Sequence, residues 1–451
     1  MKVIKFGGSS LANGAAFAQA IRIIQADQDR KVIVTSAPGK RESTDTKVTD
    51  LLIKYANEVL QGQAYQATVT QIFERYQAIG DYFNLPAEAL APIHKALVNL
   101  PNGNYPADSY LMATFKAHGE RLNARLLAAI LNHLGIKARF ADPQAIGIMV
   151  TGTPNNAVVA PETYYRLQDF KVADDERVVV PGFFGFTMAG YIATFSRGGS
   201  DITGAILARG LGAEKYENFT DVDSIYAVDP KLVEHPTPIK KMTYREMREL
   251  SYAGFSVFHD EALLPVIAAG IPINVKNTWA PEKPGTLIVP DHNFQPSSPV
   301  TGIAAGKHFA ALYLHKYLLN KEAGFTLQIL TILQEHDVSY EHMPSGIDDI
   351  TIVFDKHKLT PEIIDEICDE IQATVNPDRL EWINDFALIT VVGEGMATSP
   401  TVPAEILGIL AKEHIAIQMI NQGASKIATM IGVDPTDTNQ AIKAINHHFF
   451  N

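Results

Sequence analysis

From the N-terminus to about residue 290, short apolar runs alternate with longer segments in which apolar residues recur at helical spacing. Residues 2–6 and 31–36 are predicted strands, and residues 15–25 between them are a predicted helix. Strands and helices in this alternating order predict an α/β fold with a mostly parallel sheet covered by helices on both faces. In such folds, ligands bind at the carboxyl ends of the strands.

The pattern changes after a linker rich in proline and serine at residues 291–301. Beyond it, two successive sets of elements follow the βαββαβ order of a ferredoxin-like unit, the second without its last strand. The predicted strands are residues 310–315, 338–343, 349–355, 380–383, 386–392, 415–420 and 426–433. The predicted helices are residues 322–336, 361–373, 402–414 and 437–447. Because the second set is one strand short, we expect the two units to share strands.

Composition narrows the class of protein. The chain has 451 residues, of which 46% are hydrophobic and 20% charged, as in an ordinary globular protein. Its net charge of -12, without a basic cluster, argues against nucleic-acid binding. Cys368 is the single cysteine, which excludes an internal disulfide and a thiolate zinc site and favours a reducing cytoplasm. No apolar run approaches ~20 residues and none of signal-peptide length opens the chain, so we expect neither export nor a membrane span.

Residues 195–205 have the features of an anion-binding loop. They follow an apolar run and precede a helical one, and Gly198 and Gly199 allow backbone N–H groups to converge. The following helix adds partial positive charge at its N-terminus. Arg197 supplies a fork that can grip a carboxylate through two parallel hydrogen bonds. Asp201, at the start of the helix, is either a helix cap or a functional carboxylate.

A second glycine loop, at residues 7–10, follows the first predicted strand. It matches neither the Walker pattern, in which lysine follows the glycines, nor the three-glycine dinucleotide fingerprint. Here Lys5 precedes the glycines, at the carboxyl end of the strand. The alternative is a solvated edge lysine, but the apolar neighbours Ile4 and Phe6 favour a lysine that meets a phosphate.

Four further features carry candidate chemistry. The polar loop at residues 37–46 follows a strand and is either a mobile lid or plain connecting surface. Thr49 places a hydroxyl near the start of the next helix. Glu120, in a helical segment, either reads a substrate ammonium group or is a solvated charge, which sequence alone favours. Residues 218–230, with three aspartates and a tyrosine, either hold a nucleotide or form a tight turn.

Together these motifs resemble the aspartokinase family. Residues 5–10 (KFGGSS) are similar to its N-terminal signature, residues 197–201 (RGGSD) match a central segment, and residues 220–222 (TDV) are similar to its nucleotide segment. The match spans the chain, and residues 343–349 are most similar to a Gram-positive subgroup. The resemblance implies a monofunctional, lysine-sensitive enzyme. Its domains would be an amino acid kinase domain at 1–290, the linker at 291–301, and ACT domains at 302–384 and 385–451.

The resemblance assigns roles to individual residues. Lys5 would stabilise the transferred phosphoryl group, and Asp201 would organise the charged centre. The L-aspartate site would comprise Thr49, Glu120, Arg197 and Ser200, with Arg197 on the substrate's α-carboxylate. The nucleotide site would comprise Lys5, Gly7, Gly8, Ser9, Thr220, Asp221, Tyr226 and Lys231. Two departures stand out: Ser256 replaces a lysine that reaches the nucleotide in many relatives, and Lys426 replaces a usual glutamate.

The implied reaction transfers a phosphoryl group from ATP to L-aspartate with Mg²⁺, giving ADP and 4-phospho-L-aspartate. It would be the first step of the lysine, threonine and methionine pathway. Such a transfer depends on positioning and charge cancellation rather than on a protein nucleophile. The alternatives are a kinase of glutamate or acetylglutamate, disfavoured by the paired ferredoxin-like units and Glu120, and a non-catalytic amino-acid sensor, disfavoured by intact Lys5, Arg197 and Asp201.

The resemblance also implies regulation by the ACT domains, which would join chains in a homodimer or higher homo-oligomer. Ferredoxin-like units expose sheet edges unless they pair, and pairing creates pockets at the seam. L-lysine is the expected effector, and L-threonine is a second candidate. Residues 320–325 offer backbone N–H groups to an effector carboxylate. The effector pocket would include Gly324, Phe325, Met343 and Ser345. The alternative is that these units only hold a dimer together.

Overall fold

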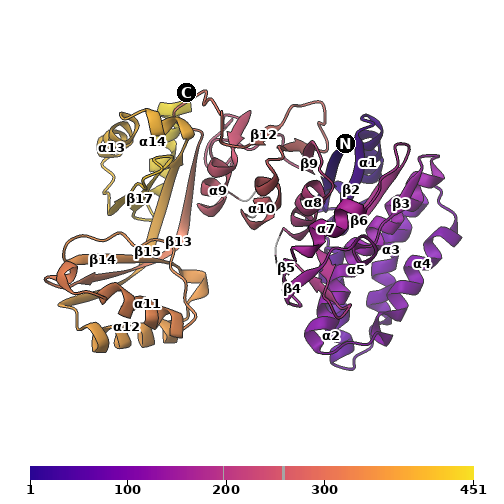
Figure 1. The fold of residues 1–451 in the computed structure, drawn as a ribbon, viewed down its shortest axis with the longest axis horizontal. Coiled ribbons are helices and arrows are strands. Elements are labelled where there is room, and N and C mark those ends of the chain that lie inside the picture. The colour runs from indigo at the N-terminus through magenta and orange to yellow at the C-terminus, as the bar shows by residue number, and fades with distance from the viewer. Residues whose placement is uncertain (197, 256–259, 451) are drawn as a thin grey trace. The chain divides into compact units, whose positions relative to one another are not determined.

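The computed structural model describes residues 1–196, 198–255 and 260–450 (Figure 1). They form two compact units. The first comprises Met1–Ile225, Pro238–Met247 and Ser256–Phe294, and the second comprises Tyr226–Thr237, Arg248–Phe255 and Gln295–Asn451. Two short segments that precede the predicted linker therefore group with the C-terminal unit.

An eight-stranded sheet forms the centre of the first unit, in the order β10-β12-β11-β9-β1-β2-β6-β3. Its strands are β1 Lys2–Phe6, β2 Arg30–Thr35, β3 Ala138–Phe140, β6 Arg177–Pro181, β9 Lys215–Thr220, β10 Lys241–Thr243, β11 Ile273–Asn277 and β12 Thr286–Val289. Neighbouring strands are parallel except β11 and β12. Two small hairpins accompany it: β4 Val150–Thr153 with β5 Asn156–Val159, and β7 Phe184–Phe186 with β8 Ile192–Thr194. The predicted mostly parallel sheet is confirmed.

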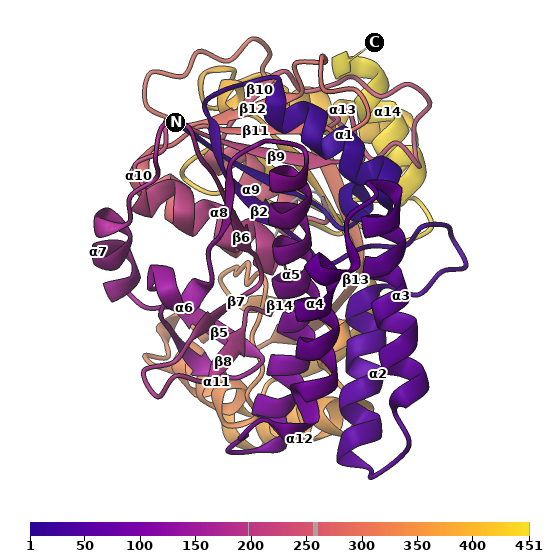
Figure 2. The ribbon, with the colours of Figure 1, turned by 90° about the vertical axis from the view of Figure 1, so that its right-hand side faces the viewer.

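Helices cover both faces of this sheet. Ile4 and Phe6 pack in one core with α1 Gly14–Gln25, α2 Val48–Leu60, α3 Gln66–Tyr82, α4 Ala87–Asn99 and α5 Asp108–His133. Figure 2 shows α2 to α5 running beside one another. The alternate residue of β1, Lys5, points to the other face, where α8 Gly199–Gly210 packs on β1, β2 and β9. The remaining helices of the first unit are α6 Pro143–Ile146, α7 Glu162–Asp169 and α10 Asp260–Ala269; α9 Tyr244–Tyr252 begins in the first unit and ends in the second.

Local signals in the sequence explain where several helices begin. The side chain of Asn13 accepts the backbone N–H of Ala16 and caps α1. Gly198 occupies the N-cap position of α8 with φ 60°, a left-handed conformation that glycine adopts without a Cβ clash. Thr360 caps the helix that starts at Pro361, whose ring suits the first helical turn.

The second unit contains a five-stranded antiparallel sheet in the order β14-β13-β15-β17-β16. Its strands are β13 Gly302–His315, β14 Asp349–Asp355, β15 Arg379–Val392, β16 Met419–Asn421 and β17 Ala428–Val433. Its helices are α11 Phe325–Glu335, α12 Pro361–Val375, α13 Val402–Lys412 and α14 Thr438–Phe450. The 14-residue strands β13 and β15 pair along both halves of the sheet, with a register shift between Gly306 and Phe309. The expected sharing of strands is confirmed.

Several strand predictions in this unit are wrong in detail. The predicted strand 310–315 is the second half of β13, and the two predicted strands 380–383 and 386–392 are the single strand β15. Residues 338–343 form no strand and contribute one isolated bridge, from His342 to Val353. For the two long strands the cause is tertiary. β13 and β15 pair with each other along nearly their whole length, while β14 and β17 each pair with one half, so both strands stay extended through polar positions at which a local pattern would break.

Two apolar cores lie in the second unit. One joins α11 and α12 to β14 and the second half of β13. The other joins α13 and α14 to the first half of β13, and it includes Val228 from the segment Tyr226–Thr237. The backbone N–H of Ile303 in β13 also donates to the carbonyl of Ala227, at 2.7 Å. Across both units, none of the described helices is long and apolar enough to cross a bilayer.

Candidate active site

Lys5 and Asp201 meet at the carboxyl end of β1. The Lys5 ammonium lies 2.7 Å from Oδ1 of Asp201, and both side chains are largely buried. Asp201 belongs to the first turn of α8, but its carboxylate pairs with Lys5 and does not act as the helix cap, a position that Gly198 occupies. The alternative of a solvated edge lysine is wrong, since β1 lies between β9 and β2 in the middle of the sheet.

The first glycine loop is held close to this ion pair. The backbone N–H of Gly7 donates to the carbonyl of Phe219 at 3.1 Å, and a Cβ on Gly7 would lie 3.8 Å from the Lys5 ammonium nitrogen. The carbonyl of Gly8 accepts the N–H of Gly39 at 2.9 Å, so the loops after β1 and β2 are joined. Ser9 is exposed beside them. This arrangement leaves a glycine loop, a buried lysine and the N-terminus of α8 together, which suits phosphate groups.

Two of the predicted aspartate-binding residues form a second group. Glu120 of α5 is 6% exposed, so the interpretation as a solvated charge is wrong. A Cβ on the neighbouring Gly119 would lie 2.8 Å from the Ala37 side chain and 3.9 Å from the Thr49 hydroxyl. The loop that contains Ala37 and Gly39 therefore contacts Gly8 on one side and the Thr49 and Glu120 group on the other.

The carboxyl group of Glu120 is buried without a cation beside it and with one oxygen unpartnered among the described residues. Burial raises the pKa of its carboxyl to about 8, although a hydrogen bond from the backbone of Ala37 offsets part of that effect. Its Oε2 is buried without a hydrogen-bond partner among the described residues. A buried acceptor of this kind is costly in the free protein and is ready to accept an ammonium donor.

The other predicted aspartate-binding residues are Ser200 and Arg197. Ser200 is buried in the first turn of α8, and its hydroxyl lies 2.6 Å from where a Cβ on Gly182 would stand. Arg197 lies outside the described residues, as does Ser256, which stands where many relatives have a nucleotide lysine.

The predicted nucleotide residues fall in both units. Thr220 ends β9, and its hydroxyl donates to Oδ1 of the exposed Asp221 at 3.1 Å. Tyr226 is half-buried and Lys231 is exposed, and both belong to the second unit. Asp223 lies between Asp221 and Tyr226 in the sequence, and it accepts hydrogen bonds from Asn277 at 2.6 Å and Lys283 at 2.5 Å. This lysine lowers the pKa of the Asp223 carboxyl.

The sequence did not reveal Arg75, a buried cation on α3 that fixes the polar loop at residues 37–46. Its guanidinium donates to the carbonyls of Gly39 at 2.7 Å and Thr46 at 2.9 Å and pairs with Asp45 at 3.1 Å. Arg41 also binds Asp45 and holds the pKa of that carboxyl well below its usual range. These contacts favour a braced loop over a mobile lid, and no local signal in a helical segment could have identified the arginine.

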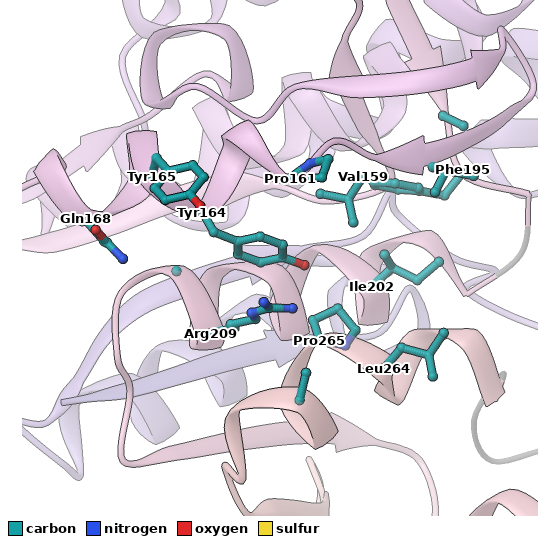
Figure 3. A pocket seen from close by; sticks show the side chains of 14 residues that line it. Val159, Pro161, Tyr164, Tyr165, Gln168, Phe195, Ile202, Arg209, Leu264 and Pro265 are labelled. Carbon is teal, nitrogen blue, oxygen red and sulfur yellow. The ribbon is translucent and has the colours of Figure 1, made fainter.

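A cavity of about 850 Å³ lies among β5, α7, α8 and α10, with mostly apolar walls (Figure 3). Phe195, Ile202 and Leu264 line it, and the guanidinium of Arg209 lies 3.9 Å from the ring centroid of Tyr164. None of its described lining residues is a predicted site residue, so we assign it no part in the chemistry.

The predicted effector residues lie at the start of α11 and on the chain segment before β14. Gly324 is the N-cap of α11 with φ 86°, and a Cβ there would meet nothing within 4 Å. Phe325 is 2% exposed and packs in the apolar core, with the Lys316 ammonium 5.2 Å from its ring centroid. Met343 packs against the same core, and Ser345 is exposed and bridges to Ile350.

Comparison with known proteins decides the family. Residues 1–277 match the amino acid kinase family, and residues 389–449 match an ACT domain. Aspartokinase 3 of Bacillus subtilis is 43% identical over 450 residues, which cover 100% of this chain and 99% of that protein. The chain belongs to the aspartokinase family.

Further relatives agree with this aspartokinase assignment. The crystal structure of Clostridium acetobutylicum aspartate kinase matches with a TM-score of 0.86 and 39% identity, and the match covers 100% of both chains. Lysine-sensitive aspartokinase 3 of Escherichia coli is 26% identical, with 99% of each chain covered. As an aspartokinase, the chain is a phosphotransferase that uses ATP and has the carboxyl group of L-aspartate as its acceptor. A kinase of another amino acid and a non-catalytic sensor are not favoured.

Proposed function

We propose that the Lys5–Asp201 pair is the centre at which the γ-phosphoryl group passes from ATP to the side-chain carboxylate of L-aspartate. One carboxylate oxygen of the substrate forms a bond to γ-phosphorus while the bond to the β,γ-bridging oxygen breaks, and ADP leaves with that electron pair. The observation that carries the proposal is the buried 2.7 Å contact beside a glycine loop and a helix N-terminus. Lys5 would offset the charge that spreads over the phosphoryl oxygens in the transition state.

On the acceptor side, we propose that Glu120 binds the α-ammonium group of L-aspartate, with Thr49, Ser200 and Arg197 completing the site. The buried, unpartnered Oε2 of Glu120 supports this role. An ammonium placed there would donate a charge-assisted hydrogen bond to Oε2 in a water-poor environment. Arg197 would then pair with the α-carboxylate, leaving the side-chain carboxylate directed at the phosphoryl group.

On the donor side, we propose that the glycine loop wraps the phosphates and that the segment after β9 holds the nucleoside. The residues are Gly7, Gly8, Ser9, Thr220, Asp221, Tyr226 and Lys231. Mg²⁺ in kinases commonly takes one or two carboxylates together with nucleotide phosphates. The described residues contain no group of three His, Cys, Asp or Glu side chains suited to a metal, which fits an ion carried mainly by ATP. Lys5 and Asn218 both contact Oδ1 of Asp201, so Oδ2 is the protein oxygen that we propose for the ion.

The decisive experiment replaces each partner of the ion pair. We expect Lys5→Ala and Asp201→Asn each to lower kcat by on the order of a hundredfold or more, because each removes a preorganised electrostatic contact. Initial rates of ADP release with L-aspartate, and with L-glutamate as control substrate, measure this effect. Near-normal turnover in either folded variant would refute the assignment.

We also propose that the second unit contains ACT domains at residues 302–384 and 385–451, after a catalytic domain at 1–290 and a linker at 291–301. L-lysine would be the inhibitor, with L-threonine as a second candidate, and the domains would join two chains in a homodimer. The lysine sensitivity named for the Escherichia coli relative supports this choice. A cytoplasmic location is proposed from the single cysteine.

The regulatory proposal is tested by titrating L-lysine and L-threonine, alone and together, against initial rate. Ser345→Leu changes an exposed residue of the proposed pocket, and Gly324→Ala changes a left-handed N-cap with open space around it. Both should lower sensitivity to the effector while leaving the uninhibited rate near that of the parent. The pocket is wrong if neither amino acid inhibits the parent, or if both variants stay fully sensitive.

A further inference from the structure

Asn218 is an unusual residue for its place in the fold. It lies inside β9, in the interior of the eight-stranded sheet, and is 3% exposed. Asparagine is depleted in strands, and a buried amide is destabilising unless its polar atoms find partners. Its neighbours along the strand on either side, Glu217 and Phe219, point to the opposite face. A specific interaction must therefore compensate for the amide at this position.

The strand register places Asn218 beside Lys5. The two residues are paired across β1 and β9, so their side chains share the face on which α8 packs. The Nδ2 atom of Asn218 donates to Oδ1 of Asp201 at 2.6 Å, and the Lys5 ammonium lies 2.7 Å from the same oxygen. Asp201 thus receives one charged donor from β1 and one neutral donor from β9.

A second contact from β9 fixes the backbone of Asp201. Tyr216 shares the face of Asn218, and its hydroxyl donates to the backbone carbonyl of Asp201 at 3.3 Å. The tyrosine is fully buried under α8, where a Cβ on Gly204 would lie 2.6 Å from its ring. One strand therefore holds both the main chain and the side chain of Asp201.

The chemistry of the amide sets its orientation. A carboxylate only accepts hydrogen bonds, so the NH₂ group and not the carbonyl of Asn218 must face Asp201. The Oδ1 atom of Asn218 is then left buried without a hydrogen-bond partner among the described residues. An unsatisfied acceptor costs stability, which is a cost that proteins accept mainly at functional sites.

We propose that Asn218 is a positioning residue of the phosphoryl-transfer centre: it fixes the rotamer of Asp201 so that Oδ1 stays on Lys5 and Oδ2 faces the reacting groups. The proposal rests on the assignment of Lys5 and Asp201 to that centre. It adds a neutral donor that no motif in the sequence identifies. A neutral donor orients the carboxylate without competing with Lys5 for its charge, whereas a second cation would weaken the hold of Asp201 on the lysine.

Two substitutions separate orientation from charge. Asn218→Leu keeps the branched shape and the number of heavy atoms but removes the donor, so Asp201 is free to rotate about Lys5. We expect kcat to fall on the order of tenfold to a hundredfold, with the KM values for L-aspartate and ATP within about twofold of the parent.

Asn218→Asp keeps the shape but places two carboxylates on one lysine. We expect the acid limb of its kcat profile to move to higher pH, because the pair binds a proton more readily than Asp201 alone.

Asn274 offers a matched control. It lies on the adjacent strand β11, is half-buried, and also has a buried Oδ1 without a partner among the described residues. Val275, and not Asn274, is paired with Asn218, so the side chain of Asn274 points to the opposite face. Asn274→Leu should leave kcat and its pH profile near those of the parent, even if the melting temperature changes.

The outcomes are distinguishable when Asp201→Asn is measured beside these variants. Turnover retained in Asp201→Asn means that the transfer centre itself is misassigned. If Asp201→Asn is inactive but Asn218→Leu keeps a kcat within about twofold of the parent, the proposed role of Asn218 is wrong. An equal loss in Asn274→Leu, or an effect on KM alone, likewise overturns it. Should the leucine variant fail to fold, a parent-like pH profile in Asn218→Asp decides against the proposal.

Discussion

The two carboxylates of the site, the largely buried Asp201 and the buried Glu120, differ in what surrounds them. Asp201 receives a lysine and an amide on one oxygen, while Oε2 of Glu120 has no partner among the described residues. The first carboxylate is organised before substrate arrives, as electrostatic preorganisation of a transition state requires. The second is incomplete, which suits recognition of a cation that the substrate itself brings. The comparison therefore suggests that one group serves the chemical step and the other serves binding.

The largest expected effect is that substitution of Glu120 changes the KM for L-aspartate, whereas substitution of Asp201 changes kcat. Glu120→Gln keeps the shape but removes the charge, so we expect the KM for L-aspartate to rise on the order of a hundredfold. The KM for ATP should change little, in contrast to the loss of kcat expected for Asp201→Asn. Steady-state kinetics with each substrate varied in turn measures both. A large fall in kcat at saturating L-aspartate would contradict the proposed division of roles.

A smaller effect concerns pH. Since burial raises the pKa of Glu120 to about 8, the free enzyme holds this carboxyl protonated at neutral pH and must ionise it to bind an ammonium group. We expect kcat/KM for L-aspartate to rise with pH, by up to about tenfold per unit well below pH 8, and to level off above it. Glu120→Gln has no such group and should lose this limb. If the variant keeps the limb, another group is responsible.

The smallest expected effect is on stability. The Glu120 carboxyl has a pKa of about 8 in the folded state and near 4.5 in the unfolded state, so it binds more protons when folded. Its contribution to the free energy of unfolding is therefore complete below about pH 4.5 and is lost as the pH rises through about 8. The melting temperature of Glu120→Gln should therefore be a few degrees above that of the parent at pH 8, and the difference should be smaller at pH 5. Asp201→Asn, which leaves Lys5 without its ion pair, should melt lower. Thermal unfolding at both pH values tests this opposite behaviour.

The fold class could be predicted from the sequence because the alternation of strand-like and helix-like segments and the glycine loops are local signals. It placed Lys5 at a strand end and Asp201 at a helix start, which are the positions where the structure joins them. It erred where neighbours in space decide the outcome. Glu120 is buried by packing of α5 against the loop after β2, and no property of its own helix distinguishes it from a solvated charge.

By itself, then, the sequence determined the strand, glycine loop and helix units, the family and the candidate residues, since these depend on residues close together along the chain. Only the tertiary structure decided that β13 and β15 run through both halves of one sheet, because their length depends on partners far away in sequence. It also decided the contacts of Asn218 and Arg75. The physical reason is the same in each case: strand register and helix packing join distant segments, and burial then determines which polar side chains need a partner.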